Sequence, residues 1–133
     1  MKPKTIAVTG GGVMGAQIAQ VFATHGHTVR VHDLTEDRLA AARARVLDGR
    51  FGLRASVARG KLGEDDAREA QERLTYVTDL AVACDGVDLV QEAVPEDMGL
   101  KVRVFRELDR LSPPGAVLLS NTAGLPVAAL AYA

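Results

Sequence analysis

Short apolar runs alternate along this chain with longer segments in which apolar residues recur at helical spacing. The run Thr5–Thr9 (TIAVT) ends at a glycine and predicts a buried strand. From Val13 to Phe22 the apolar positions have helical spacing, and Gly26 is expected to cap the end of that helix. A second apolar run, Thr28–Asp33 (TVRVHD), predicts a second strand directly after the helix.

The segment 36–73 is long, highly charged and helical in its pattern. Thr35 precedes two acidic residues and is expected to cap the first helix of this segment. We predict two helices that are separated near Gly60–Gly63, the second of which begins at Glu64–Asp66. The high charge of both helices predicts an excursion that projects from the body of the domain.

The remaining segments continue the alternation of strands and helices. The predicted elements are a strand in LTYVTDL, a small helix from Asp79, a strand at Val87–Val94, a helix at about Asp97–Leu111, a turn at Ser112–Gly115, a strand in AVLLSNTA and the start of a helix in LPVAALAYA. This alternation predicts an α/β fold with a doubly wound, mostly parallel sheet that is covered by helices on both faces.

Composition narrows the class of protein. The chain has 133 residues, 47% of them hydrophobic and 25% charged, which fits one soluble globular domain. The net charge of −1 argues against a general nucleic-acid binder, and no apolar run is long enough to span a membrane. The single cysteine, Cys84, excludes an internal disulfide and fits a reducing compartment. We expect a cytoplasmic protein with no metal site and no nucleic-acid or membrane partner.

A glycine-rich turn joins the first predicted strand to the first predicted helix. Gly10 permits the tight turn, Gly12 lets a pyrophosphate approach the backbone, and Gly15 lets the helix pack closely on the strand. The candidate phosphate-binding residues are Gly10, Gly11, Gly12, Val13, Met14 and Gly15. The free N–H groups of the first helical turn would face the phosphates. The sequence therefore predicts a Rossmann-type dinucleotide site.

An acidic residue completes this pattern. Asp33 ends the second predicted strand, where a carboxylate can accept hydrogen bonds from the adenosine ribose and would repel a 2′-phosphate. NAD is therefore favoured over NADP as the cofactor. No G-K-[S/T] follows the glycines, which argues against a nucleotide triphosphatase. A structural glycine turn with a helix-capping aspartate is the alternative.

Two polar loops follow the last two predicted strands, on the same edge of the sheet as the glycine turn. The first contains Gln91, Glu92, Glu96 and Lys101, and the second contains Ser120, Asn121 and Thr122. For Glu92 a structural role in orienting its loop is as well supported as a functional one.

The segments VTGGGVMGAQIAQVFATHGHTVRVHD, VQEAVPEDMGLKVRVFREL and LLSNTAGLPV together resemble the NAD-binding domain of the L-3-hydroxyacyl-CoA dehydrogenase family. The resemblance runs in order over nearly the whole chain and is loosest over Arg43–Arg73. Relatives that act on other 3-hydroxy acids, such as the lambda-crystallin/gulonate dehydrogenase branch, share these motifs, so the substrate class stays open.

The resemblance implies roles for individual residues. The glycine turn would wrap the pyrophosphate of NAD, and Asp33 would hold the adenosine ribose. Glu96 and Lys101 would lie on the cofactor rim, and Asn121 would lie near the nicotinamide. The alternatives are that Glu96 only complements a helix dipole and that Lys101 is a solvated helical lysine.

The charged excursion suggests a second partner. If the excursion is helical, four basic residues fall on nearly one line: Arg43, Arg50, Arg54 and Lys61. In the family that the chain resembles, a helical pair at this place contacts coenzyme A, and such a line could bind its phosphates. Gly49 and Gly52 weaken the helix, and an ordinary solvated face is the alternative.

Catalytic residues are not predicted within the chain. The resemblance places the catalytic histidine in a segment beyond Ala133, and none of His25, His27 and His32 is expected to replace it. The family's substrate-contacting serine corresponds here to Ala123. We therefore expect residues 1–133 to be a fragment, lacking the end of the NAD-binding domain and the helical substrate and dimerisation domain of a homodimeric parent.

Three functions are compatible with these residues. The first is the NAD-binding portion of an oxidoreductase of fatty acid metabolism that moves a hydride between NAD and a 3-hydroxyacyl or 3-ketoacyl thioester, with little activity alone. The second is a dehydrogenase of the same fold for a free hydroxy acid or a carrier-bound acyl group. The third is a non-catalytic NAD-binding module.

Overall fold

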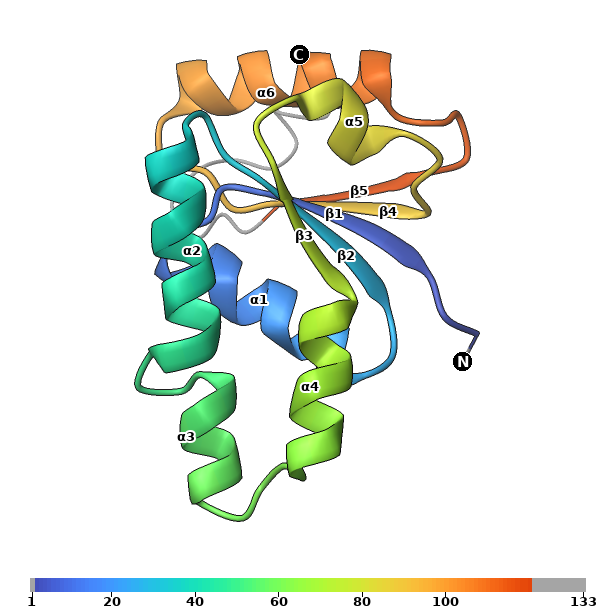
Figure 1. Ribbon diagram of the computed structural model, residues 1–133. Helices are drawn as coiled ribbons and strands as arrows, with labels where there is room; N and C mark the ends of the chain where they lie inside the picture. The colour runs from blue at the N-terminus through green and yellow to red at the C-terminus, as the bar shows by residue number, and fades with distance from the viewer. Residues whose placement is uncertain (1, 121–133) are drawn as a thin grey trace.

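Parallel strands form one sheet in the order β3-β2-β1-β4-β5 in the computed structural model, which describes residues 2–120 (Figure 1). The strands are β1 (Thr5–Thr9), β2 (Thr28–His32), β3 (Leu74–Val77), β4 (Leu89–Glu92) and β5 (Val117–Ser120). The strand order reverses between β1 and β4, which lie side by side. This reversal creates the crevice at the carboxyl ends of the strands where Rossmann folds bind ligands. The predicted doubly wound fold is confirmed.

Helices cover both faces of the sheet, as Figure 1 shows. They are α1 (Val13–Thr24), α2 (Glu36–Asp48), α3 (Leu53–Ala58), α4 (Glu64–Glu72), α5 (Leu80–Cys84) and α6 (Met98–Leu111). Ile6 and Val8 of β1 join a core with α1, α2 and α4, whereas Ala7 joins the opposite core with α5 and α6. Ile6, Ala7 and Val8 of the central strand β1 are all buried because helices cover both faces of that strand.

The excursion between β2 and β3 consists of three helices, so the prediction of two is wrong. The helical pattern breaks at Gly49–Gly52 as well as near Gly60. The chain leaves α2 at Gly49, whose ψ of 164° is extended, and a Cβ on this residue would lie 2.4 Å from the carbonyl oxygen of Arg45. The predicted projection is partial: α3 extends past α1 in Figure 1, but Leu53 is fully buried in the core.

The remaining elements follow the sequence pattern closely. The cap predicted at Thr35 is present, since its side-chain oxygen accepts a backbone N–H at the start of α2. Asp79 and Asp97, which the sequence predicts only as helix starts, cap α5 and α6 in the same way. Gly26 follows α1 with a φ of 92°, as expected of a residue that ends a helix. β4 is shorter than the predicted Val87–Val94, and the helix expected in LPVAALAYA lies outside the described residues. No described helix is long and apolar enough to cross a membrane.

Candidate cofactor-binding site

A cavity of about 900 Å³ lies at the carboxyl ends of the strands, where the strand order reverses. The glycine turn after β1, the end of β2, the inner face of α2 and the loop after β4 line it. Its volume is at the upper end of the usual range for ligand sites, about 300–1,000 Å³. Gly10, Gly12, Val13 and Met14 all line this cavity, as the candidate turn requires.

The three motif glycines are required for different reasons. Gly10 has a φ of 100°, and a Cβ there would lie 2.5 Å from the carbonyl oxygen of Ala93. A Cβ on Gly15 would lie 1.8 Å from the carbonyl oxygen of Gly10. Gly12 differs, because a Cβ there would have no heavy atom within 4 Å. Since Gly12 lines the cavity and caps α1 without a side-chain hydrogen bond, its backbone is open to a phosphate.

Asp33 links the end of β2 to the glycine turn. Its Oδ2 accepts a hydrogen bond of 2.9 Å from the backbone N–H of Gly11, and its Oδ1 accepts one of 2.8 Å from that of Leu34. A carboxylate can accept about four hydrogen bonds, so two acceptor positions remain for ribose hydroxyls. The glycine cradle and this carboxylate together fit a dinucleotide with a free 2′-hydroxyl.

Two arginines of α2 complete this side of the cavity, and the sequence analysis missed them. Arg45 donates to the carbonyl oxygen of Gly11 at 3.0 Å, and the Nη1 atom of Arg38 lies 3.7 Å from Oδ1 of Asp33. Both arginines line the cavity. Their spacing of seven on a capped helix places them on one face and is the signal that could have identified them.

Lys101 and Glu96 occupy different environments. Glu96 lines the cavity, and its side chain is 45% exposed. Lys101 is fully buried, with its Nζ 2.8 Å from both carboxylate oxygens of Glu92 and 3.3 Å from Oε1 of Glu96. The alternative of a solvated helical lysine is therefore wrong. Lys101 connects α6 to the end of β4 through a buried ion pair with Glu92, and to the loop after β4 through an ion pair with the partly exposed Glu96.

Glu92 is the centre of this buried network. It accepts a hydrogen bond of 2.6 Å from the backbone N–H of Val94 and one of 2.7 Å from the hydroxyl of Ser120 at the end of β5. The structural role considered for Glu92 agrees with this geometry. Asn121 and Ala123, which the sequence analysis singled out, lie outside the described residues.

The histidines lie apart from one another. His32 lines the cavity beside Asp33, and its Nδ1 is 2.8 Å from the hydroxyl of Thr9. Burial lowers the pKa of His32 from its ordinary value of 6.5, although the nearby carboxylates of Asp33 and Asp79 act in the opposite direction. His27 accepts a hydrogen bond from the backbone N–H of Lys4, at the opposite end of the sheet.

The basic residues of the excursion do not form one helical line, because the break at Gly49–Gly52 separates them. Arg43 lies on α2 with its guanidinium 4.7 Å from the ring centre of Tyr76. Arg50 lies in the turn after α2 and stacks over Phe51, and Arg54 lies on α3. Lys61 follows α3. The predicted single line is therefore wrong.

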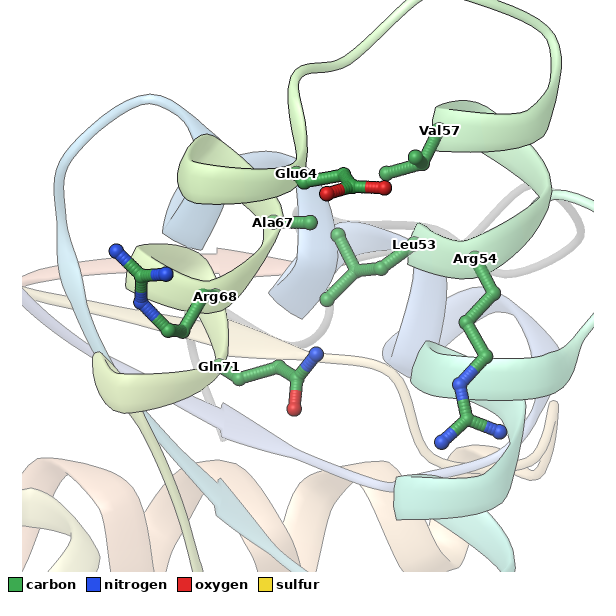
Figure 2. Close-up of a pocket in the computed structure, with 7 residues that line it drawn as sticks. All are labelled: Leu53, Arg54, Val57, Glu64, Ala67, Arg68 and Gln71. Atoms are coloured by element: carbon green, nitrogen blue, oxygen red, sulfur yellow. The ribbon is translucent and has the colours of Figure 1, made fainter.

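A smaller cavity of about 240 Å³ lies between α3 and α4. Figure 2 shows its lining residues, which are Leu53, Arg54, Val57, Glu64, Ala67, Arg68 and Gln71. Leu53 points into the space between the two helices, whereas Arg54 extends along its edge. The arginines are already paired, Arg54 with Asp48 and Arg68 with Asp65. In the described part of the chain, no group of three or more metal-ligating side chains is present.

Comparisons with known proteins agree with this geometry. A family model described as "3-hydroxyacyl-CoA dehydrogenase, NAD binding domain" matches residues 5–133. The 3-hydroxyadipyl-CoA dehydrogenase of Escherichia coli strain K12 is 39% identical over 129 residues, which are 96% of this chain and 26% of that protein. The mitochondrial hydroxyacyl-coenzyme A dehydrogenase of Sus scrofa is 34% identical over 132 residues, 98% of this chain and 42% of that enzyme.

A solved structure with the same fold extends the comparison. The crystal structure of FadB2 from M. tuberculosis has a TM-score of 0.92 to this chain at 38% sequence identity. The match covers 99% of this chain and 45% of that protein. The chain thus spans less than half of the length of these relatives.

Proposed function

The chain belongs to the family of 3-hydroxyacyl-CoA dehydrogenase NAD-binding domains, and we propose that it supplies the cofactor site of a dehydrogenase for 3-hydroxyacyl thioesters. The observation that carries this proposal is the cavity at the strand reversal, which the open backbone of Gly12 and the carboxylate of Asp33 both line. NAD is the cofactor of this family.

When bound, NAD would supply the hydride acceptor for oxidation of the carbon that bears the substrate hydroxyl. The glycine turn binds the pyrophosphate, and Asp33 binds the adenosine ribose. Glu96, which forms an ion pair with Lys101, would lie toward the nicotinamide. The same role, which the resemblance implies for Asn121, falls outside the described residues. No described residue is assigned the proton transfer. In the whole protein, a histidine beyond residue 133 performs that step, and a helical domain completes the substrate cleft and a homodimer.

We propose that the protein binds the substrate through its coenzyme A moiety. The named relatives act on coenzyme A thioesters, and arginines of the excursion gather around an exposed aromatic ring. The guanidiniums of Arg50 and Arg59 lie 5.5 Å and 5.7 Å from the ring centre of Phe51. Cations beside an aromatic face suit an adenine ring and its phosphates. The cytoplasm stays a prediction, since the relatives include both bacterial and mitochondrial enzymes.

Titration of the 133-residue chain with NADH, followed by nicotinamide fluorescence, tests the proposed cofactor site. We expect saturable binding, weaker binding of NADPH, and little reduction of acetoacetyl-CoA. Rapid turnover by this chain alone would contradict the assignment of the proton transfer to residues beyond 133. Failure to bind NADH would contradict the proposed function itself.

The coenzyme A handle has its own test, because a dehydrogenase for a free hydroxy acid would not need it. R50E and R59E together should weaken binding of acetoacetyl-CoA by roughly tenfold or more, through loss of charge-assisted hydrogen bonds from the two arginines beside Phe51. R110E is the matched control, since Arg110 is exposed on α6 and pairs with Glu107. If the arginine variants and R110E weaken acetoacetyl-CoA binding equally, a free hydroxy acid is favoured as the substrate.

A different observation tests the non-catalytic NAD-binding module. An in-frame H-x-x-N-P segment downstream of residue 133 would exclude it.

A further inference from the structure

The carboxylate of Glu92 is buried at the end of β4 and has no solvent exposure. Its Oε1 accepts hydrogen bonds from the hydroxyl of Ser120 and from Nζ of Lys101. Its Oε2 accepts hydrogen bonds from the same Nζ and from the backbone N–H of Val94. All four contacts are 2.6 to 2.8 Å long. Every acceptor position of this carboxylate is therefore in use.

Stability alone is a weak explanation for this network. A buried ion pair usually contributes little net stability, because the loss of hydration offsets most of the attraction between the charges. A well-packed apolar pair would hold the sheet equally well. What a fully satisfied network adds is rigidity and a single arrangement of the segments that it joins.

The segments that Glu92 joins are the loop after β4, the start of α6 and the end of β5. Val94 lies in the loop after β4 and lines the cavity, Lys101 lies in the first turn of α6, and Ser120 ends β5. Lys101 also reaches Glu96, which lines the cavity. Asp33 lies on the other side of β1, at the end of β2. Since β1 separates β2 from β4, a dinucleotide with its adenosine at Asp33 places its nicotinamide half at these segments.

We propose that Glu92 is a positioning residue for the nicotinamide half of the cofactor. Acting through Val94 and Lys101, it fixes the loop after β4, and its hydrogen bond with Ser120 holds the end of β5, so that the site distinguishes a complete NADH from its adenosine half. This inference rests on the proposed cofactor site, but it assigns a role to a residue that never touches the cofactor.

The test compares NADH with ADP-ribose, which shares the adenosine and the pyrophosphate but lacks the nicotinamide. In the full chain, E92Q should weaken NADH binding by roughly tenfold, as the loss of a charge-assisted hydrogen bond predicts, with ADP-ribose binding nearly unchanged. The enhanced fluorescence and anisotropy of bound NADH should fall in parallel. A merely structural role would weaken both ligands alike, or neither, and that result would overturn the proposal.

A second variant keeps the test decisive if E92Q fails to fold. S120A removes only the hydrogen bond between β5 and Glu92 and should reduce the preference for NADH in the same direction, by a smaller factor. S112A is the matched control, because Ser112 follows α6 at the opposite end of the sheet. If the unchanged chain binds both ligands equally, or S120A keeps the full preference, the positioning role is wrong while the cofactor site stands. If the unchanged chain binds neither ligand, the proposed function fails first.

Discussion

Gly12 allows a test in which stability and cofactor binding separate. Any residue can adopt its φ of −68°, and a Cβ there would have no heavy atom within 4 Å. G12A should therefore change the free energy of unfolding by less than about 0.5 kcal/mol. The added methyl group would occupy the space that the pyrophosphate needs, so NADH affinity should fall by roughly tenfold or more. Urea unfolding and fluorescence titration measure the two quantities.

G15A is the contrasting variant. Its Cβ would lie 1.8 Å from the carbonyl oxygen of Gly10, so α1 must move away from β1. We expect a loss of roughly 1–3 kcal/mol of stability, as in overpacked cores, together with the loss of NADH binding. The two variants together test the placement of the phosphates: if G12A binds NADH as tightly as the unchanged chain, the pyrophosphate does not lie against Gly12.

His32 predicts a specific pH dependence of stability. Because burial lowers its pKa below the ordinary 6.5, the unfolded chain binds more protons than the folded chain between the two values. The contribution of His32 is complete above 6.5 and is lost as the pH falls from 6.5 through the lowered pKa. The slope for one proton is at most about 1.4 kcal/mol per pH unit.

The variant H32N isolates this contribution, since the asparagine stays polar beside Thr9 but does not titrate. Its melting temperature should fall less than that of the unchanged chain when the pH is lowered from neutral. His25 and His27 are present in both chains, so their effects cancel in the difference. Parallel curves for the two chains would show that His32 does not couple folding to protonation.

The site residues that the sequence predicts are those whose roles rest on local backbone geometry. The glycine turn and Asp33 belong to this group, because a strand, a turn and a helix in succession place them. For Lys101 the sequence pattern names the residue but not its burial, which depends on packing of α6 against the end of β4. For Arg45 the helical spacing from Arg38 indicates a shared face, but its contact with Gly11, 34 positions earlier, depends on tertiary packing.

At the scale of elements, the break between α2 and α3 depends on close backbone packing. A Cβ on Gly52 would lie 2.8 Å from the carbonyl oxygen of Val46 and 3.0 Å from that of Leu47. G52A should therefore destabilise the chain by roughly 1–3 kcal/mol in urea unfolding, since the turn must open. G115A is the control, because a Cβ on Gly115 would have no neighbour within 4 Å. Equal stability of G52A and the unchanged chain would contradict this account of the turn.

The predictable element boundaries are those with a chemical cap. Thr35, Asp79 and Asp97 each begin a helix with a side-chain hydrogen bond to the backbone, and each is recognisable in the sequence. The end of α2 has no such signal. A glycine in a helix interior lowers helix stability by only about 1 kcal/mol relative to alanine. The presence of Gly49 and Gly52 in the sequence is therefore compatible with either a weakened continuous helix or two separate helices. Burial of Leu53 in the core that it shares with α1, α2 and α4 is a tertiary effect.

For the whole molecule, the two cores differ in how completely the described residues cover them. Helices α1, α2 and α4 cover one face of β1, β2 and β3. On β5, Leu118 packs into the opposite core with α6, whereas Val117 and Leu119 are 51% and 41% exposed. Among the described residues, β5 pairs only with β4, so its outer edge carries unpaired backbone groups beside exposed apolar side chains.

This edge predicts self-association of the 133-residue chain. Exposed apolar side chains on an unpaired strand favour pairing with a second copy, and lysine at such positions opposes it. V117K together with L119K should weaken association by roughly tenfold in sedimentation velocity over a range of protein concentrations. NADH binding should persist, because neither side chain lines the cofactor cavity. V82K is the matched control, since Val82 is 50% exposed on α5. A chain that is monomeric at every concentration, or that responds equally to V82K, would show that the edge of β5 does not direct association.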